Sequence, residues 1–394
     1  MEGTRRRDDV KGGATLMGQL VTSIPTLHPG ERLLCGPGPS NVNPQVLEAM
    51  QAPMNGHLDP DFWDILLDLT AGLKALWRNP DGLSLCFSAS GTSGMEAGIT
   101  NLVEPGDKVI AIHAGFFGAR LADMARRHQA DLVEVTAPLG QIPSLEDVEA
   151  ALRANPDTKL VAVVHAETST GVRYPLPELS ALMKGGAPDA LLMVDAVTSL
   201  GGERVDAADW GIDYGYSCSQ KSLGCPPGLS PFTISPRALE VQKAKKHPAP
   251  YTYDIGELAR YWVERPITYH HTMPILQYYA LYEGIRLGLE EGLENRWARH
   301  QDAGGYFQGQ MRDRGYTFLS DPDHQLWELS AINVPEGVDG KEIQSKILRQ
   351  FNIEVGGGLG PTAPPIWRVG LMGVNANRET ADRVLGAFDA VLPR

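Results

Sequence analysis

Five short apolar runs between residues 83 and 235 constrain the fold more than any other feature of the sequence. They are LSLCFSAS (83–90), KVIAIHA (108–114), KLVAVVHAE (159–167), ALLMVDAV (190–197) and LSPFTIS (229–235). Gly, Pro or polar residues bound each run, as they bound buried strands. Segments of helical character lie between them, at 94–103, 117–128, 144–155 and 176–186. This alternation predicts an α/β fold, with a largely parallel sheet covered by helices on both faces.

The sequence changes character after residue 236. Residues 274–314 have the apolar spacing of a long amphipathic helix. The last part is typical of a small α+β domain, with strands expected at 327–337 and 366–373 and helices at 341–351 and 378–392. We therefore predict an N-terminal arm at 1–44, a large α/β domain at 45–290 and a small α+β domain at 291–394. The first sixteen residues of the arm are expected to be mobile.

Charge and cysteine content narrow the class of protein. Lys and Arg number 35 and Asp and Glu number 48, a net charge of −13, which argues against nucleic acid or an anionic membrane as the main partner. The four cysteines have neither a CxxC pair nor zinc spacing, which predicts reduced thiols. No apolar run approaches the ~18–20 residues of a membrane span. The first sixteen residues lack the apolar core of a secretion signal, so a cytoplasmic location is expected.

Three features near the expected strand ends could carry chemistry. SASGTSG (88–94) joins a strand to a helix, either as a plain Gly/Ser turn or as a cradle whose backbone N–H groups bind a phosphate. Asp195 ends a very apolar strand, where it either caps a loop or holds a cationic partner. Lys221 lies in SQKSLGCPPG (219–228), either as a surface lysine or as a nucleophilic amine with a lowered pKa.

Together these features match the requirements of pyridoxal phosphate. Lys221 would form the Schiff base, and Asp195 would keep the pyridine nitrogen protonated so that the ring withdraws electrons. The cradle at 88–94 would bind the phosphate. Taken singly, none of the three distinguishes this interpretation from its structural alternative.

The sequence resembles the fold-type I, class V aminotransferases, within them the alanine–glyoxylate and serine–pyruvate group. The resemblance runs from about residue 33 to 392. The stretches that carry it are GPGPSN (36–41), SASGTSGMEA (88–97), HAETSTGV (165–172), VDAVTSLGG (194–202), SQKSLGCPPG (219–228), YHHTMP (269–274), EEGLENRW (290–297) and WRVGLMG (367–373). It implies a mostly parallel seven-stranded sheet with helices on both faces, a small C-terminal α+β domain and pyridoxal 5′-phosphate as the cofactor.

The resemblance also implies a role for each residue around the cofactor. Lys221 and Asp195 would be catalytic, with Lys221 moving the proton of the 1,3-shift. The residues implied to hold the phosphate are Ser90, Gly91, Thr92 and Gln220. Val197 and Phe117 would pack on the two ring faces, and the Thr168 hydroxyl would contact the ring oxygen. Relatives often carry Trp, His and Ser where this sequence has Phe117, Thr92 and Thr168.

Residues outside the sheet are assigned by the same resemblance. Tyr269 and Thr272 would reach the phosphate of a partner subunit, which implies a homodimer with composite active sites. Arg368 would bind the substrate α-carboxylate, supported by Ser40 and Asn41. The paired histidines of YHHTMP lack a third ligand at useful spacing, so no metal is expected.

The resulting hypothesis is a ping-pong transaminase. It would move the amino group of alanine or serine to a 2-oxo acid, glyoxylate or pyruvate. Small donors are favoured because no second arginine is obvious, although Arg173, Arg260 or Arg265 could enter the site. An (S)-ureidoglycine–glyoxylate aminotransferase is the alternative. A cysteine desulfurase-like activity lacks a cysteine after Cys225, a dinucleotide oxidoreductase lacks G-x-G-x-x-G, and a silent homologue would lack Lys221 or Asp195.

Overall fold

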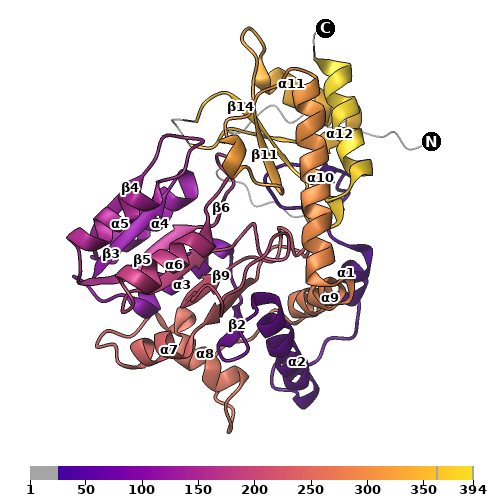
Figure 1. Ribbon diagram of the computed structural model, residues 1–394. Helices are drawn as coiled ribbons and strands as arrows, with labels where there is room; N and C mark the ends of the chain where they lie inside the picture. Colours follow the sequence, from indigo (N-terminus) through magenta and orange to yellow (C-terminus); the bar gives the residue numbers. More distant parts are fainter. Residues whose placement is uncertain (1–24, 361–362, 393–394) are drawn as a thin grey trace, which may run out of the picture. The chain divides into compact units, whose positions relative to one another are not determined.

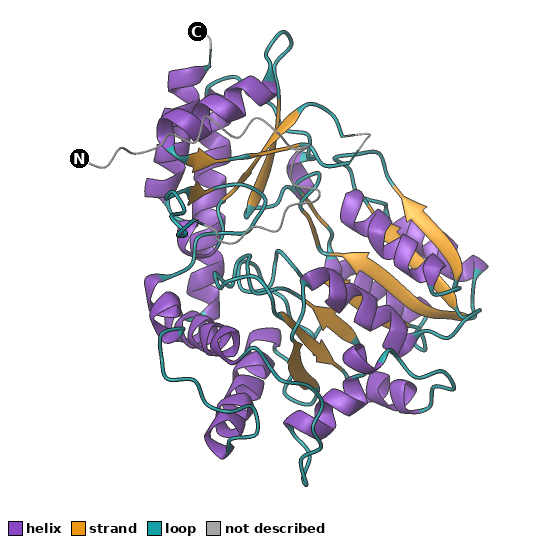
Figure 2. Ribbon diagram, turned by 180° about the vertical axis from the view of Figure 1, so that it is seen from behind, coloured by secondary structure: helices purple, strands orange, loops and turns teal. Residues whose placement is uncertain are grey.

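The computed structural model describes residues 25–360 and 363–392 (Figure 1). The first sixteen residues, which we expect to be mobile, lie outside the described residues. Leu33–Arg394 forms one compact unit, so the domain boundaries expected at residues 45 and 291 stay a prediction. Figure 2 shows the strands of this unit in separate groups, each flanked by helices.

The central sheet has seven strands, as expected. In spatial order they are β2 (Leu83–Phe87), β10 (Ser230–Ile234), β9 (Tyr214–Tyr216), β8 (Leu191–Asp195), β5 (Thr158–Val164), β3 (Lys108–His113) and β4 (Asp131–Thr136). Only β10 runs opposite to the other six strands. Every residue of β8 is buried, and successive side chains in a strand point to opposite faces. Both faces are therefore covered, which confirms the mostly parallel α/β sheet.

The edge strand β4 is not among the five apolar runs. β4 pairs with β3 along its whole length, and no other described strand pairs with it on the opposite side. Its residues are mostly exposed or half-buried, and only Val135 is buried. An edge strand of this kind has no continuous apolar run, so it lacks the signal that marked the central strands.

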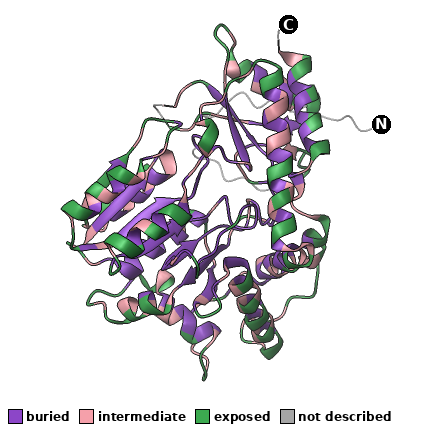
Figure 3. Ribbon diagram, viewed as in Figure 1, coloured by how far each residue is buried: buried purple, intermediate pink, exposed green. Residues whose placement is uncertain are grey.

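Helices connect the strands and cover the sheet (Figure 1). They are α1 (Pro44–Ala49), α2 (Pro60–Trp77), α3 (Gly91–Leu102), α4 (Phe116–Arg127), α5 (Leu145–Ala154), α6 (Leu176–Gly186), α7 (Pro236–Lys243) and α8 (Ile255–Trp262). Polar side chains cap several first turns: Asp59 accepts from Asp61 N at 2.9 Å and Ser144 from Asp147 N at 3.1 Å. In Figure 3 the sheet is buried, whereas the outer sides of these helices are exposed.

The long helix expected at 274–314 is two helices, α9 (Ile275–Glu291) and α10 (Leu293–Asp313). Gly292 separates them with a φ of 82°, a conformation that glycine adopts at little cost. Apolar spacing continues on both sides of Gly292, so periodicity alone did not reveal the break. The two helices lead from the central sheet to the C-terminal part of the chain (Figure 1).

The C-terminal part has its own core and its own small sheet. Its elements are β11 (Leu329–Asn333), α11 (Gly340–Phe351), β12 (Ile353–Glu354), β13 (Gly356–Gly357), β14 (Ile366–Gly370) and α12 (Arg378–Val391). The strand β1 (Leu33–Leu34) pairs with β12, so the N-terminal segment joins this part. A short hairpin, β6 (Ala166–Glu167) and β7 (Val172–Arg173), follows β5.

Two further expectations can be compared with the fold. All four cysteines are buried and unbridged. Among the residues that the structure describes, no helix is long and apolar enough to cross a membrane.

Candidate active site

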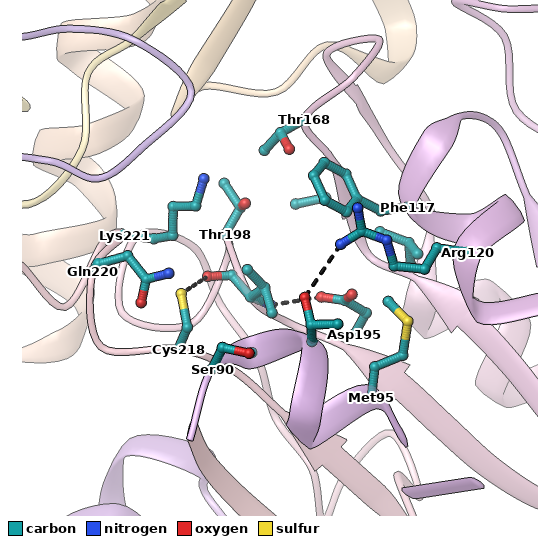
Figure 4. A pocket seen from close by; sticks show the side chains of 15 residues that line it. Ser90, Met95, Phe117, Arg120, Thr168, Asp195, Thr198, Cys218, Gln220 and Lys221 are labelled. Atoms are coloured by element: carbon teal, nitrogen blue, oxygen red, sulfur yellow. Dashed lines mark hydrogen bonds between the residues drawn. The ribbon is translucent and has the colours of Figure 1, made fainter. Parts of the chain in front are cut away.

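A cavity of about 200 Å³ lies at the carboxyl end of the central strands (Figure 4). This is the edge at which open α/β sheets bind their ligands. The residues predicted from the sequence that line it are Ser90, Gly91, Thr92, Phe117, Thr168, Asp195, Val197, Gln220 and Lys221. These residues lie at or after the carboxyl ends of five strands, β2, β3, β5, β8 and β9. The fold thus brings together residues far apart in the sequence, such as Ser90 and Lys221, which are 131 positions apart.

Lys221 lies in the connection between β9 and β10 and is largely removed from water. Its Nζ donates a hydrogen bond to the carbonyl oxygen of Pro37, in the N-terminal GPGPSN segment. Burial lowers the pKa of Lys221, and the nearby positive charge of Arg368 lowers it further. A lysine with a lowered pKa is deprotonated more readily than a surface lysine, as a nucleophilic amine requires.

Asp195 is the last residue of β8, and both of its carboxylate oxygens are held. Oδ1 accepts from the backbone N–H of Val197 at 2.8 Å, and Oδ2 accepts from the hydroxyl of Tyr216 at 2.6 Å. Burial raises the pKa of Asp195 to about 6, while the hydrogen bonds from Tyr216 and Val197 oppose this shift. The carboxyl group therefore has a fixed orientation in the cavity wall.

Tyr216 is a site residue that was not identified from the sequence. It stands directly beside Asp195 in the parallel pairing of β8 and β9, so both side chains lie on the same face of the sheet. The YGY run looks like an ordinary buried strand, and the only signal was a phenol next to small residues. Strand order and register decide that its hydroxyl meets Asp195.

The predicted phosphate cradle lies in the turn between β2 and α3, and its binding of a phosphate stays a prediction. Ser90 caps α3, its Oγ accepting from Ser93 N at 3.4 Å, and the first N–H groups of a helix have no partner within it. A Cβ on Gly91 would lie 3.0 Å from Val197 Cγ2 and 3.1 Å from Cys218 Cβ. Glycine thus lets the helix start approach the cavity floor closely.

A second buried carboxylate, Glu167, positions the opposite wall of the cavity. Its Oε2 accepts from the backbone N–H groups of Phe117 and Gly118, both at 3.0 Å, and Oε1 accepts from Ser169 Oγ at 2.6 Å. Glu167 therefore holds the first turn of α4, which carries Phe117. Glu167 lies in the HAETSTGV stretch, but no role for it was predicted from the sequence. The available signal was a carboxylate directly after an apolar strand, as at Asp195.

Arg368 lies in the middle of β14 and points its guanidinium toward the cavity wall. Nε donates to the Gly357 carbonyl at 2.6 Å, and Nη1 donates to the Thr168 carbonyl at 3.1 Å. Within residues 25–360 and 363–392, no hydrogen bond engages Nη2. Burial lowers the pKa of Arg368 to about 10, so it stays charged at neutral pH. Arg368 itself is not among the residues that line the cavity, and its binding of a substrate carboxylate stays a prediction.

Ser40 and Asn41 anchor the N-terminal segment and do not line the cavity. Ser40 Oγ donates to the carbonyl of Lys221 at 2.9 Å, and its backbone N–H donates to the carbonyl of Gln220 at 2.9 Å. Asn41 Oδ1 accepts from the backbone N–H of Leu34 at 2.8 Å. The segment thus packs on the Lys221 loop. Direct contact of these two side chains with a substrate stays a prediction.

Tyr269 and Thr272 also lie outside the cavity of their own chain. The Tyr269 hydroxyl is 3.3 Å from Thr272 Oγ1, and Tyr269 is 52% exposed. Their predicted contact with a partner subunit's phosphate stays a prediction. Among the described residues, no group of three or more His, Cys, Asp or Glu side chains could hold a metal ion.

Comparisons with known proteins are consistent with this geometry. The family model for aminotransferase class V matches residues 33–374. The chain is 36% identical to the alanine–glyoxylate aminotransferase of Drosophila melanogaster, over 95% of each chain. It is 32% identical to the (S)-ureidoglycine–glyoxylate transaminase of Bacillus subtilis, over 92% of this chain and 91% of that protein. The crystal structure of an alanine–glyoxylate aminotransferase from Nostoc superposes with a TM-score of 0.90 at 44% identity, covering 94% and 98% of the two chains.

Proposed function

The chain belongs to the class V aminotransferases, and on this premise we propose that it transfers the amino group of alanine or serine to glyoxylate or pyruvate. It is an aminotransferase, and pyridoxal phosphate is its cofactor. The observation that carries the choice of substrates is the similarity to alanine–glyoxylate aminotransferases over nearly the whole chain.

The residues of the cavity fit this cofactor. No hydrogen bond among the described residues engages the side chain of Gln220, so its amide N–H groups are available to donate to a phosphate. Gly91 lets the start of α3 pack closely against Val197 and Cys218 at the cavity, and a helix N-terminus favours an anion such as a phosphate. Asp195 would hold the ring nitrogen and Lys221 would bind the aldehyde carbon. When bound, pyridoxal phosphate supplies an electron sink for the bonds at the substrate Cα.

The chain's own residues supply binding and proton transfer. Arg368 binds the α-carboxylate of either substrate and so orients the Cα hydrogen. The amine of Lys221, with its pKa lowered by burial, would take the proton from the donor Cα and pass it on within the same half-reaction, and would deliver a proton to the acceptor Cα in the second half. Tyr216 and Val197 keep the Asp195 carboxylate in place throughout.

The positions of three other arginines support the proposal that the amino donor is small. Arg173 pairs with Glu203, Arg260 pairs with Glu257, and Arg265 lies over the ring of Trp63. None of the three lines the cavity. Arg173, Arg260 and Arg265 therefore offer no partner in the cavity to a donor with a side-chain carboxylate.

We further propose a homodimer with composite active sites, located in the cytoplasm. Tyr269 is exposed beside its neighbour Thr272, where it can reach a second copy. Large apolar side chains are exposed on α1, on α2 and between them, at Leu47, Met54, Leu58 and Leu67. Such a surface is typical of an interface. The location rests on the sequence features alone.

The second candidate is transamination of (S)-ureidoglycine, favoured by the similarity to the Bacillus subtilis enzyme. The test is an absorbance spectrum of the purified holoenzyme before and after L-alanine, L-serine or (S)-ureidoglycine is added. We expect alanine or serine to convert the visible band to that of the pyridoxamine form. Conversion by ureidoglycine alone would replace the proposed donors, and conversion by none would overturn both candidates.

A further inference from the structure

The residues assigned to the cofactor phosphate carry no charge. They are Ser90, Gly91, Thr92, Gln220, Tyr269 and Thr272. A phosphate monoester carries a charge of roughly −1.5 to −2 at pH 7. The start of α3 supplies the equivalent of only about half a positive charge. The predicted phosphate site therefore leaves most of the anion's charge without a partner.

Arg120 lines the same cavity, on α4, one turn after Phe117. Its Nη1 donates to the hydroxyl of Thr92 at 3.2 Å, which places the guanidinium beside the first turn of α3 (Figure 4). The guanidinium carbon also lies 5.1 Å from the ring centroid of Phe117 and 5.0 Å from that of Phe116. Stacking on two rings and a hydroxyl contact hold the charge in one position.

Arg120 has no carboxylate partner in the described chain, unlike its neighbours on the same helix. Arg126 pairs with Glu134 at 2.6 Å, and Arg127 pairs with Asp123 at 2.7 Å. Apart from the bond to Thr92, no hydrogen bond to the Arg120 guanidinium occurs among the described residues. Several of its five N–H donors are thus available at the cavity wall.

We propose that Arg120 is the ionic partner of the cofactor phosphate, held at the cradle by Thr92 and Phe117. The planar guanidinium can give a phosphate two parallel hydrogen bonds and a full charge. The inference rests on pyridoxal phosphate being the cofactor and adds a binding residue to the site. It makes Thr92 a positioning residue, because its hydroxyl orients Arg120.

A purely structural role makes a different prediction. If Arg120 only supported the ring of Phe117, its loss would weaken the binding of any ligand stacked on that ring. Pyridoxal has the same ring and aldehyde but no phosphate. Comparing the two ligands therefore separates a phosphate contact from support of the stacking surface.

The experiment titrates cofactor-free protein with pyridoxal phosphate and, separately, with pyridoxal, following the visible absorbance band. For Arg120→Met we expect the Kd of pyridoxal phosphate to rise by about tenfold or more, while that of pyridoxal changes by less than about twofold. Arg127→Met removes a charge from the same helix and should leave both Kd values unchanged. Arg120→Lys should lie between Arg120→Met and the wild type.

A melting curve measures phosphate binding without the pyridoxal ring. Inorganic phosphate should stabilise the cofactor-free wild type more than Arg120→Met, since binding to the folded state raises Tm. Equal losses for both ligands would overturn the proposal in favour of support for Phe117, and unchanged Kd values would remove Arg120 from the site. If Arg120→Met does not fold, Arg120→Lys decides by the same selective, smaller loss, because it keeps a charge but not the two-pronged contact. Failure of the wild type to bind pyridoxal phosphate would contradict the cofactor assignment.

Discussion

Arg296 Nη2 lies 2.6 Å from the carbonyl oxygen of Ser222, the residue directly after Lys221. The same guanidinium donates through Nε to the Gly201 carbonyl at 2.9 Å and through Nη1 to Glu291 at 2.8 Å. Arg296 lies at the start of α10 and is buried. A residue of the C-terminal helices thus fixes the loop that carries the proposed proton-transfer amine.

Glu291 extends this connection to the strand of Arg368. Its carboxylate also binds Arg299 Nε at 2.6 Å, and Arg299 Nη1 donates to the carbonyl of Gly373 at 2.9 Å. Gly373 follows β14, which contains Arg368. The Glu291 carboxylate therefore connects two sets of contacts. Through Arg296 it is linked to the loop that carries Lys221, and through Arg299 it is linked to the segment that follows Arg368.

Replacing Arg296 by Met is expected to lower kcat by about tenfold or more, with a smaller change in KM. The Lys221 loop loses the contact at the Ser222 carbonyl, whereas Arg368 remains in place to bind substrate. The visible band of the holoenzyme should also shift, because Lys221 moves relative to Asp195. Arg286→Met, which breaks exposed pairs with Glu283 and Glu290, is the control. A lower Tm with unchanged kcat and spectrum would reduce Arg296 to a structural residue.

Lys221→Ala is expected to remove the covalent link to the cofactor and to lower transamination by about 10²-fold or more. The proposed proton carrier is lost, and water cannot replace an amine fixed in the cavity. Absorbance spectra and initial rates with the preferred donor measure the two effects. Lys243→Ala, at an exposed lysine that pairs with Glu240, should behave like the wild type. Turnover near the wild-type rate in Lys221→Ala would refute the catalytic assignment.

Arg368→Ala should raise KM for every amino acid and every 2-oxo acid alike, by roughly 10- to 100-fold. All of these substrates present an α-carboxylate, and its charged partner is lost. Arg368→Lys retains a charge but loses the two-pronged geometry, so its KM should fall between those of Arg368→Ala and the wild type. Steady-state kinetics with two donors and two acceptors test this. An increase confined to one substrate, or none, contradicts a common carboxylate site.

The buried pair Glu203 and Glu328 predicts how stability depends on pH. Both oxygens of Glu328 and Oε2 of Glu203 are buried without hydrogen-bond partners among the described residues. Burial, and then the charge of Glu203, raise the pKa of Glu328 well above its usual value. The folded protein therefore holds a proton that the unfolded chain releases at lower pH. Protonated Glu328 therefore contributes to stability. This contribution is fully present below the pKa of Glu328 in the unfolded chain and is lost as pH rises through its pKa in the folded protein.

Glu328→Gln should remove this dependence, because an amide of the same shape stays neutral. Its Tm is expected to exceed that of the wild type by a larger margin at about pH 9 than at about pH 5. Calorimetry across this range measures the margin. Glu240→Gln, at an exposed carboxylate, should follow the wild type. A margin that is constant with pH would show that Glu328 is not protonated in the folded state.

Local pattern was sufficient for several parts of this molecule. Buried strands such as β8 form continuous apolar runs, so both their positions and the residue that ends each one could be read directly. Asp195 and the cradle at 88–94 were identified for that reason. The edge strand β4 and the break at Gly292 were missed. Neither interrupts or creates a local apolar pattern.

The partners of these residues could not be predicted in the same way. Tyr216 meets Asp195 only because β9 lies beside β8 in a particular register. Glu167 holds Phe117, 50 residues away, and Arg120 meets Thr92, 28 residues away. None of these pairs has a spacing that recurs in helices or strands, so no periodicity reveals it.

The sequence by itself determined the α/β class, the mostly parallel sheet and the chemical groups at the strand ends, because hydrophobic pattern and side-chain type are local properties. Only the tertiary structure decided which neighbours hold those groups. Ser40 rests on the backbone of Lys221 across 181 residues, and Arg296 reaches Ser222 across 74. Such contacts depend on strand order and on how the two cores pack together. Both are determined by interactions along the whole chain and not by any local segment.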